Sequence, residues 1–193
     1  MEQKVLLAGA SGNGIYYTSN SGATWTQSNI TSDNFNSVSL SSDGTKGIAG
    51  GASNNGIYYT NNSGANWTQS DVTINNFRSI ALSSDGTKGI ANMTNNGIYL
   101  TNDSGENWTQ INITSGSFNV TLSSDGTNGI AGSSSSNGIY YTSDSGATWT
   151  QSINVTTSSF YAVALSSNGT KGIAGSIAGN GIYYTSDSGA TWT

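Results

Sequence analysis

Proline, cysteine and histidine are all absent from this chain of 193 residues, and arginine occurs once, as Arg78. Without cysteine the chain forms no disulfide, and its redox compartment cannot be deduced. Without histidine or cysteine it lacks the usual ligands of zinc, haem and copper. We therefore expect no metal site and no cofactor.

Positive charge and long apolar runs are also scarce. Five basic residues stand against ten acidic ones, which gives a formal charge of −5 and a pI near 4.2. Nucleic-acid binding needs clustered positive charge, so this class of partner is excluded. No apolar stretch is long enough for a membrane span, and residues 1–5 do not begin like a signal peptide. The sequence predicts a soluble chain of unknown compartment, with an extracellular or cell-surface origin left open.

Repetition is what the chain has in abundance. An octet that ends in tryptophan occurs five times, with 41 to 43 residues between successive tryptophans. A period this regular over the whole chain marks a repeat architecture, in which each unit buries its apolar faces against its neighbours. One domain is expected, with repeats at about residues 1–34, 35–76, 77–117, 118–159 and 160–193.

Each octet has the pattern Thr-x-Asp/Asn-x-Gly-x-Thr/Asn-Trp and is predicted to be a turn between two strands. The Asp or Asn side chain can accept hydrogen bonds from backbone N–H groups a few residues further along the chain. Gly can adopt the positive φ that such a turn needs. Trp packs beneath the hairpin, with its indole N–H free to meet a carbonyl. Because two octets carry Asn instead of Asp, we expect a structural acceptor and not a catalytic carboxylate. The predicted structural residues are Asn20, Gly22, Trp25, Asn62, Gly64, Trp67, Asp103, Gly105, Trp108, Asp144, Gly146, Trp149, Asp187, Gly189 and Trp192.

The octet resembles the Asp-box, or BNR repeat, of sialidases, sortilin-type receptors, some glycoside hydrolases, fungal lectins and photosystem II assembly factors. All five repeats carry the resemblance. It implies a β-propeller in which each octet forms the hairpin between the third and fourth strands of a blade. It says little about function, because the activities in the family differ widely.

The repeat that begins at residue 35 is predicted to hold four short strands, at residues 35–41, 46–50, 56–59 and 66–70. Asn55-Gly56 and its counterparts indicate tight two-residue hairpins. The repeat that begins near Phe118 is one residue shorter than its siblings before Asp125, so Phe118 is expected in a shifted register or in a loop. Four short strands in each repeat are typical of a propeller blade.

Side-chain size supports the same fold, because small residues fill the first two strands of each repeat and Tyr and Trp fill the last two. Sheets that converge at an axis and splay outward need this gradient. A β-helix or helical repeats fit the turn signals less well. The sequence therefore predicts an all-β fold, a β-propeller of five four-stranded antiparallel blades whose first blade lacks its inner strand, 19 strands in all.

A strand that continues the chain after Thr193 would complete the first blade. A trimmed chain, a fragment of a larger ring and an engineered repeat protein therefore all stay open. We favour a monomer, with self-association through the incomplete blade as the alternative, because an unpaired strand edge invites pairing.

Function is expected on the propeller face whose connections vary in sequence, since the octets and the Ser-Ser-Asp-Gly-Thr turns of the other face are nearly constant. Variable loops on one face are where repeat proteins usually bind, although neutral drift of surface loops is an alternative. The expected partner is an unidentified protein or glycan. Candidate binding residues in these loops are Asn54, Asp71, Asn95, Ser135 and Asn154.

Enzymatic interpretations find little support. Sialidase activity in the resembling family relies on an arginine triad, which one arginine cannot provide. A two-carboxylate glycosidase would have to use Asp33 and Asp71, the acids of the variable loops. We expect a non-enzymatic scaffold or binding module, with a lectin-like propeller as the alternative and a glycosidase remnant less favoured. For the lectin, the periodic tyrosines are better explained by packing between blades; they are Tyr16, Tyr58, Tyr99, Tyr140 and Tyr183.

Overall fold

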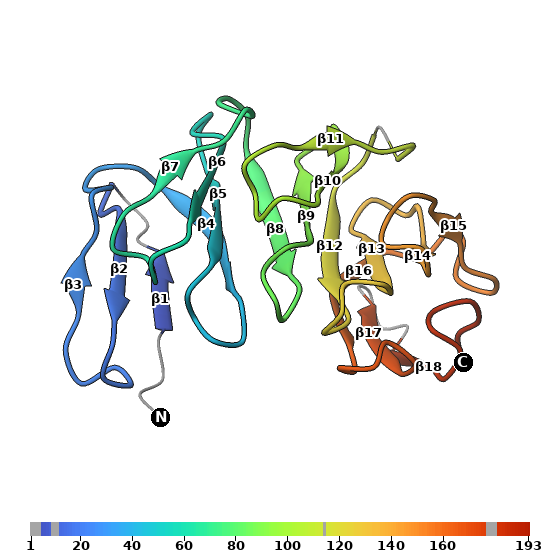
Figure 1. The fold of residues 1–193 in the computed structure, drawn as a ribbon. Coiled ribbons are helices and arrows are strands. Elements are labelled where there is room, and N and C mark those ends of the chain that lie inside the picture. Colours follow the sequence, from blue (N-terminus) through green and yellow to red (C-terminus); the bar gives the residue numbers. More distant parts are fainter. Residues whose placement is uncertain (1–4, 9–11, 114, 177–180) are drawn as a thin grey trace.

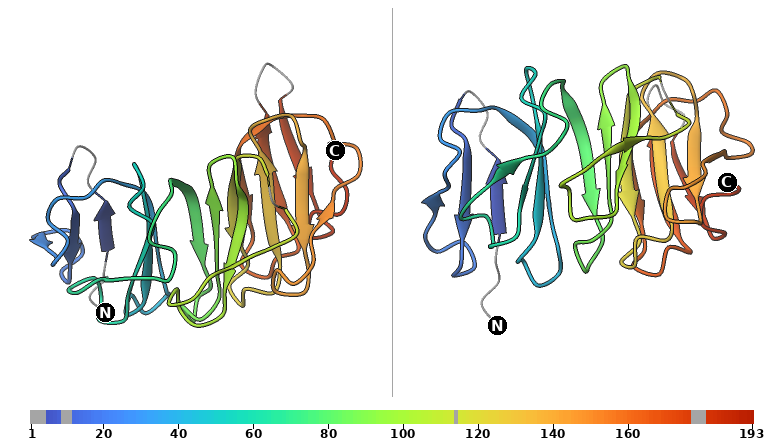
Figure 2. Two further views of the ribbon diagram at one scale, coloured as in Figure 1. Left: turned by 90° about the horizontal axis from the view of Figure 1, so that it is seen from above. Right: turned by 45° about the horizontal axis from the view of Figure 1, so that its top comes forward.

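The computed structural model describes residues 5–8, 12–113, 115–176 and 181–193. Within these ranges the chain consists of strands joined by turns and loops, without a helix. The strands form five antiparallel sheets that stand side by side as the blades of a fan (Figure 1). Two further views place the first and last blades at opposite ends of an open arc (Figure 2). The predicted all-β architecture of five propeller blades is confirmed.

Each blade takes its strands in chain order, so neighbouring strands in a sheet are also neighbours in sequence. The first blade contains β1 (Val5–Ala8), β2 (Ile15–Thr18) and β3 (Thr26–Gln27). The second contains β4 (Phe35–Leu40), β5 (Gly47–Gly51), β6 (Ile57–Thr60) and β7 (Thr68–Gln69). The third contains β8 (Phe77–Leu82), β9 (Gly89–Met93), β10 (Gly97–Thr101) and β11 (Thr109–Gln110). The fourth contains β12 (Phe118–Leu122), β13 (Gly129–Ser133), β14 (Ile139–Thr142) and β15 (Thr150–Gln151). The fifth contains β16 (Phe160–Leu165), β17 (Gly172–Ser176) and β18 (Ile182–Thr185).

The described residues hold 18 strands where the sequence predicts 19. The predicted fourth strand of the last blade is reduced to one pair, in which Tyr184 and Thr193 exchange backbone hydrogen bonds of 2.9 and 3.1 Å. The fourth strands of the other blades have two residues, which is shorter than the predicted span of residues 66–70. This shortening is a consequence of the octet, which keeps its side-chain bonds until just before the strand begins.

The first strands of successive blades lie next to one another at the narrow side of the fan. Ser39 Oγ of β4 accepts the Leu82 N–H of β8 at 3.1 Å, and Ser79 Oγ accepts the Val120 N–H at 3.1 Å. The turns that follow these strands are joined through the main chain. A run of N–H to carbonyl bonds of 2.7 to 2.8 Å connects four of these turns, at Ser42, Ser84, Ser124 and Ser167.

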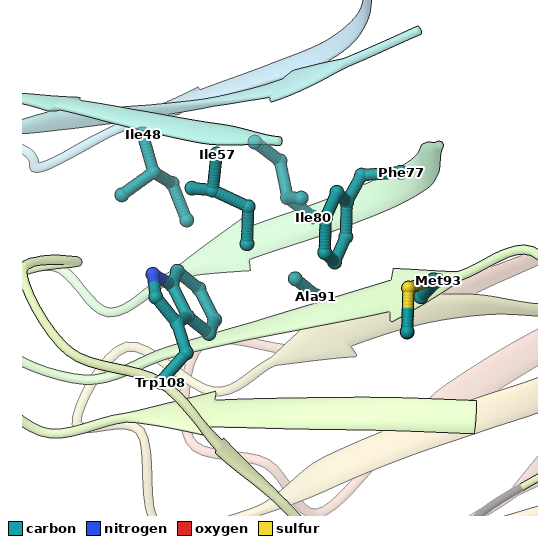
Figure 3. Close-up of a cluster of buried hydrophobic side chains, with 7 residues drawn as sticks. All are labelled: Ile48, Ile57, Phe77, Ile80, Ala91, Met93 and Trp108. Atoms are coloured by element: carbon teal, nitrogen blue, oxygen red, sulfur yellow. The ribbon is translucent and has the colours of Figure 1, made fainter. Parts of the chain in front are cut away.

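The hydrophobic core is divided among the joints between blades. Ile48 and Ile57 of the second blade meet Trp108, Phe77 and Ala91 of the third (Figure 3). Equivalent clusters fill the other three joints. Each blade therefore buries its apolar faces against its neighbours, as the repeat pattern predicts.

The structure corrects the expected position of Phe118. This residue lies in β12, paired with Ser133, and is buried in the core. Three sibling first strands contain a β-bulge at their second residue, as at Asn36 between Phe35 and Ser37. The short repeat simply lacks the bulge residue, so Phe118 keeps its place in the ladder.

In the second, third and fourth blades the Asn-Gly pairs do not form the two-residue turns that the sequence predicts, whereas Asn180 of the last pair lies outside the described residues. In the second blade a loop over residues 52–56 joins β5 to β6, and the Asn55 N–H donates to the Ala52 carbonyl at 3.1 Å. Gly56 has φ +71°, and a Cβ there would lie 2.2 Å from the Val72 carbonyl oxygen. Glycine is required by this close approach of the neighbouring loop and by its left-handed backbone.

Candidate functional site

The octet turns are built around a carboxylate or amide acceptor, as predicted. Asp144 Oδ1 accepts the Thr142 hydroxyl at 2.8 Å and the Thr148 N–H at 2.9 Å. The Thr142 oxygen in turn accepts the Gly146 N–H at 3.0 Å. Asn20 Oδ1 makes the same two bonds in the first octet, at 2.8 and 2.9 Å. The Asp and Asn versions are therefore one turn, which does not need the charge.

The tryptophan of an octet lies beneath its own turn. The Trp149 indole N–H donates to the Gly146 carbonyl at 3.2 Å, and Trp192 donates to Gly189 at 3.0 Å. The predicted positive φ of the octet glycines is confirmed, with values from +84° to +97°. The serine before each glycine also has a positive φ, +62° at Ser145, which the sequence does not reveal.

The octets of the third, fourth and fifth blades also lie on the preceding blade. A Cβ added to Gly105 would be 2.6 Å from Ile48 Cγ2 and 3.2 Å from Tyr59 Cβ of the second blade. Gly189 approaches Tyr141 and Ile130 of the fourth blade in the same way, at 3.0 and 3.3 Å. The octet is thus a joint between blades as well as a turn within one.

The octet carboxylates are held in the charged form by their hydrogen bonds. The Thr148 hydroxyl, the Thr148 N–H and the Thr142 hydroxyl lower the pKa of Asp144 to about 2, and equivalent bonds do the same for Asp187. At Asp103 burial opposes this effect, but bonds from Asn107 and Thr101 still lower the pKa. A carboxylate that is stabilised as an anion is a poor general acid, which agrees with the predicted structural role.

The variable connections of the repeats lie together, as predicted. The Ala52 N–H of the β5–β6 loop donates to the Asn34 carbonyl of the preceding interblade connection at 2.8 Å. The Ser134 N–H donates to the Ser117 carbonyl at 2.9 Å in the fourth blade. These two kinds of loop form one surface, which we call the loop face.

The structure does not gather the five candidate binding residues into one site. All five are exposed. Three have a left-handed backbone, with φ of +70°, +62° and +72° at Asn54, Asn95 and Asn154. Ser135 donates its N–H to Ser133 Oγ at 3.1 Å. Asp71 Oδ1 accepts a hydrogen bond from the Trp108 N–H of the next blade at 3.0 Å, so its carboxylate links the second and third blades.

A hollow of about 390 Å³ and another of about 210 Å³ lie on the last blade, whereas a third, of about 270 Å³, lies on the loop face. This third hollow is formed where the connection after β11 meets the β13–β14 loop and β14. None of the five candidate residues lines it. Its lining consists of Asn112, Ile113, Ser115, Phe118, Asn137 and Tyr140.

Four of the five periodic tyrosines pack at the joints, which is the alternative that the sequence favours over a sugar platform. Tyr140 meets Phe118 edge to face, with ring centroids 5.8 Å apart and planes at 85°. Tyr58, Tyr99 and Tyr183 make equivalent contacts. Burial raises the pKa of Tyr99, and burial and the neighbouring Asp33 raise that of Tyr58. Tyr140 therefore both packs against Phe118 and lines the hollow, and the periodic spacing of the tyrosines alone does not reveal the second role.

The two acids considered for a glycosidase are each engaged with other groups. Asp33 Oδ2 accepts the Tyr58 hydroxyl at 3.3 Å, and Asp71 holds the Trp108 N–H. Within the described ranges, no three or more Asp or Glu side chains are grouped so as to hold a metal ion. The same ranges contain no helix of the length and apolarity that a membrane crossing requires.

No protein-family model matches the chain, and no curated protein matches it either. Solved structures are similar over nearly all of its length. An ancestral GH74 enzyme has a TM-score of 0.72 at 16% identity, over 95% of this chain and 28% of that one. YCF48 bound to D1 peptide has a TM-score of 0.69 at 21% identity, over 100% and 64%. The computationally designed Ika8 protein has a TM-score of 0.78 at 9% identity, over 100% and 58%.

At these identities the similarity establishes the fold, a β-propeller repeat architecture, and leaves the activity open. The chain spans less than two thirds of each of these three proteins. The three differ in kind, because one is an enzyme, one is bound to a peptide and one is designed.

Proposed function

We propose that this chain is an Asp-box propeller repeat protein that acts as a non-enzymatic binding module. Its ligand binds on the loop face, at the hollow lined by Asn112 and Tyr140. The Asp-box assignment is supported by five octets whose Asp or Asn side chains make the same bonds. The binding role is supported chiefly by one observation, the 270 Å³ hollow on the variable face.

The lining of the hollow defines the ligand class. Two amides, at Asn112 and Asn137, and two hydroxyls, at Ser115 and Tyr140, can donate and accept hydrogen bonds, and the described lining includes no charged residue. The volume lies just below the range usual for small-molecule pockets, so it accommodates one side chain or one sugar ring. The ligand is therefore a neutral, polar group carried on a longer chain.

A peptide fits this hollow better than a glycan does. Sugars stack on the open face of an aromatic ring, whereas Phe118 is 1% exposed and forms an edge-to-face pair with Tyr140. A structurally similar protein, YCF48, has been solved with a bound peptide, which adds support for a peptide ligand here. The lectin-like alternative rests on the amides and hydroxyls that the hollow also offers.

Binding is tested by screening a peptide array and a glycan array with the intact chain and then titrating the best ligand calorimetrically. Tyr140→Phe should weaken binding about threefold to tenfold, because it removes one hydrogen bond worth about 0.5–1.5 kcal/mol. Tyr99→Phe is the matched control, since it makes the same change at the same position of the third blade.

Equal effects of the two tyrosine variants would move the site away from this hollow. Hits confined to the glycan array, with competition by the free sugar, would favour the lectin. Hydrolysis of a chromogenic glycoside that disappears in Asp71→Asn would favour the glycosidase.

A further inference from the structure

The two ends of the arc expose surfaces that every internal joint buries. In the internal joints, the isoleucines of the second and third strands lie under the tryptophan of the next blade. Ile130 and Ile139 of the fourth blade are 0% exposed beneath Trp192, and Ile48 and Ile57 are 0% exposed beneath Trp108. This arrangement recurs along the chain and defines what each blade face is shaped to receive.

On the last blade, no part of the described chain covers the same face. Its counterparts of Ile130 and Ile139 are Ile173 and Ile182, which are 55% and 79% exposed. Tyr184 is 61% exposed beside them. The 390 Å³ hollow is lined by Ile173 and Tyr184, and the 210 Å³ hollow by Ile173 and Ile182. We call this surface, defined by Ile173, Ile182 and Tyr184, the socket.

The first blade presents the matching part at the other end. Trp25 is 40% exposed, whereas Trp67, its counterpart in the second blade, is 3% exposed in a joint. A Cβ built on Gly22 would find only Trp25 Cζ2 within 4 Å among the described residues, at 3.9 Å. The octet of the first blade is therefore folded like the others, but no blade among the described residues lies beneath it.

We propose that the socket binds the first-blade octet of a second copy of this chain, with Trp25 over Ile173 and Ile182. The contact repeats the four internal joints, so its two sides are already complementary in shape and chemistry. It joins different surfaces of the two copies, which makes it heterologous; such contacts give a ring where the rotation closes and a filament where it does not. The inference does not depend on what the loop face binds.

The intermolecular joint is weaker than an internal one. The joints among the second, third and fourth blades also include contacts between the inner strands of both blades, such as the bond from the Leu82 N–H to Ser39 Oγ. The first blade, as described, contributes β1 to β3 and no strand in that inner position. Association should therefore be reversible and depend on concentration.

Sedimentation velocity of the intact chain over a range of concentrations tests the proposal. The mass should rise with concentration in the wild type and stay monomeric in Ile182→Asp, which puts a charge in the socket, and in Trp25→Ser. Mixing these two variants should restore one joint and give a 1:1 heterodimer, because one keeps the tryptophan and the other keeps the socket. Ile74→Asp, at an apolar site that is 63% exposed outside the socket, should associate like the wild type.

Circular dichroism and thermal unfolding show whether each variant is folded, and Ile173→Ser supplies a milder socket variant. Acrylamide quenching of the wild type gives an independent measurement, since Trp25 should become less accessible as the mass rises. A wild type that stays monomeric at every concentration would overturn the proposal. So would a mixture that forms no heterodimer, or an Ile74→Asp variant that dissociates.

Discussion

The octet glycine adopts a left-handed backbone and, in most repeats, leaves space for the preceding blade. These two roles can be separated by comparing octets within this chain. Gly105 has φ +95°, and a Cβ there would lie 2.6 Å from Ile48 Cγ2 of the preceding blade. Gly22 has φ +88° but no such neighbour among the described residues. Both positions need the left-handed backbone, and only Gly105 also needs the space.

Gly105→Ala should therefore destabilise the protein more than Gly22→Ala does. Either alanine meets the backbone strain, which costs about 1–3 kcal/mol. Gly105→Ala adds overpacking of about 1–3 kcal/mol, because Ile48 cannot move without disturbing the joint. Denaturant unfolding of the two variants measures the difference. Equal free energies of unfolding would mean that the close approach to Ile48 is easily relieved.

Residue types predict the turn better than they predict the joint. The bonds of Asp144 and the φ of Gly146 follow from the chemistry of one octet, so the sequence indicates both. The contact of Gly105 with Ile48 depends on a residue 57 positions earlier in the chain, and no local pattern encodes it. The role of Asp71 was missed for the same reason, because its partner is a main-chain N–H of the next blade.

At the scale of strands, the bulge in the first strand of a blade is matched by a residue in the blade before. Gly50 and Gly132 face bulged strands, and a Cβ on them would lie 2.9 Å from Phe77 Cβ and 2.6 Å from Val163 Cγ1 respectively. Asn92 occupies the equivalent position opposite the unbulged β12 and is fully buried. Its side chain accepts the Phe118 N–H at 2.9 Å and donates to the Gly97 carbonyl at 2.7 Å.

This match predicts a coupled pair of changes in the joint between the fourth and fifth blades. Gly132→Asn alone should destabilise by about 1–3 kcal/mol through overpacking against Val163. Deleting Tyr161, the bulge residue of β16, should recover part of that loss by making β16 resemble β12. A double-mutant cycle compares the free energies of unfolding of the wild type, both single variants and the double variant. Additivity within about 0.5 kcal/mol would contradict the coupling.

The strand order was predictable from the sequence, whereas the irregularities were not. Alternation and turn residues give four strands in each repeat, with the boundaries shifted by one or two residues. A missing residue before Asp125 is visible in the sequence, but whether it moves Phe118 or removes a bulge depends on the partner strand. The hollow was equally hidden, because Asn112 and Tyr140 come from separate repeats.

At the scale of the whole molecule, acidic turns recur from blade to blade, which ties stability to pH. Hydrogen bonds from Ser or Thr hydroxyls and backbone N–H groups lower the pKa of Asp85, Asp125, Asp144 and Asp187 to about 2, from an ordinary value of 3.8. These groups bind more protons in the unfolded chain than in the folded one between these values. Their stabilisation is therefore complete above about pH 4 and is lost as the pH falls toward 2.

Urea unfolding between pH 2 and 6 should show this loss, and exchanging the octet residues should change its size. Asp144→Asn should flatten the pH dependence while keeping the fold, because Asn20 makes the same bonds in the first octet. Asn62→Asp should steepen it. Unchanged slopes in both variants would mean that the octet carboxylates do not contribute to acid unfolding.

The arc of blades was predictable as a propeller, but its open ends were not. Repeats such as 35–76 and 77–117 specify how one blade meets the next, so four joints form as expected. Whether the first and last blades meet depends on the angle between blades, which no residue pattern gives.

The serine turns connected through their main chains have a consequence for how such a molecule can change. The Ser42 N–H donates to the Ser84 carbonyl at 2.8 Å and the Ser42 hydroxyl donates to the same carbonyl at 3.1 Å, on the side opposite the variable loops. The main-chain part of this link recurs from Ser84 to Ser124 and from Ser124 to Ser167, and it uses atoms that every amino acid possesses. We expect that loops can be exchanged between blades, and that whole blades can be added or removed, without loss of these main-chain bonds between neighbouring turns. The residues of the loop face can therefore change without changing how one blade packs on the next.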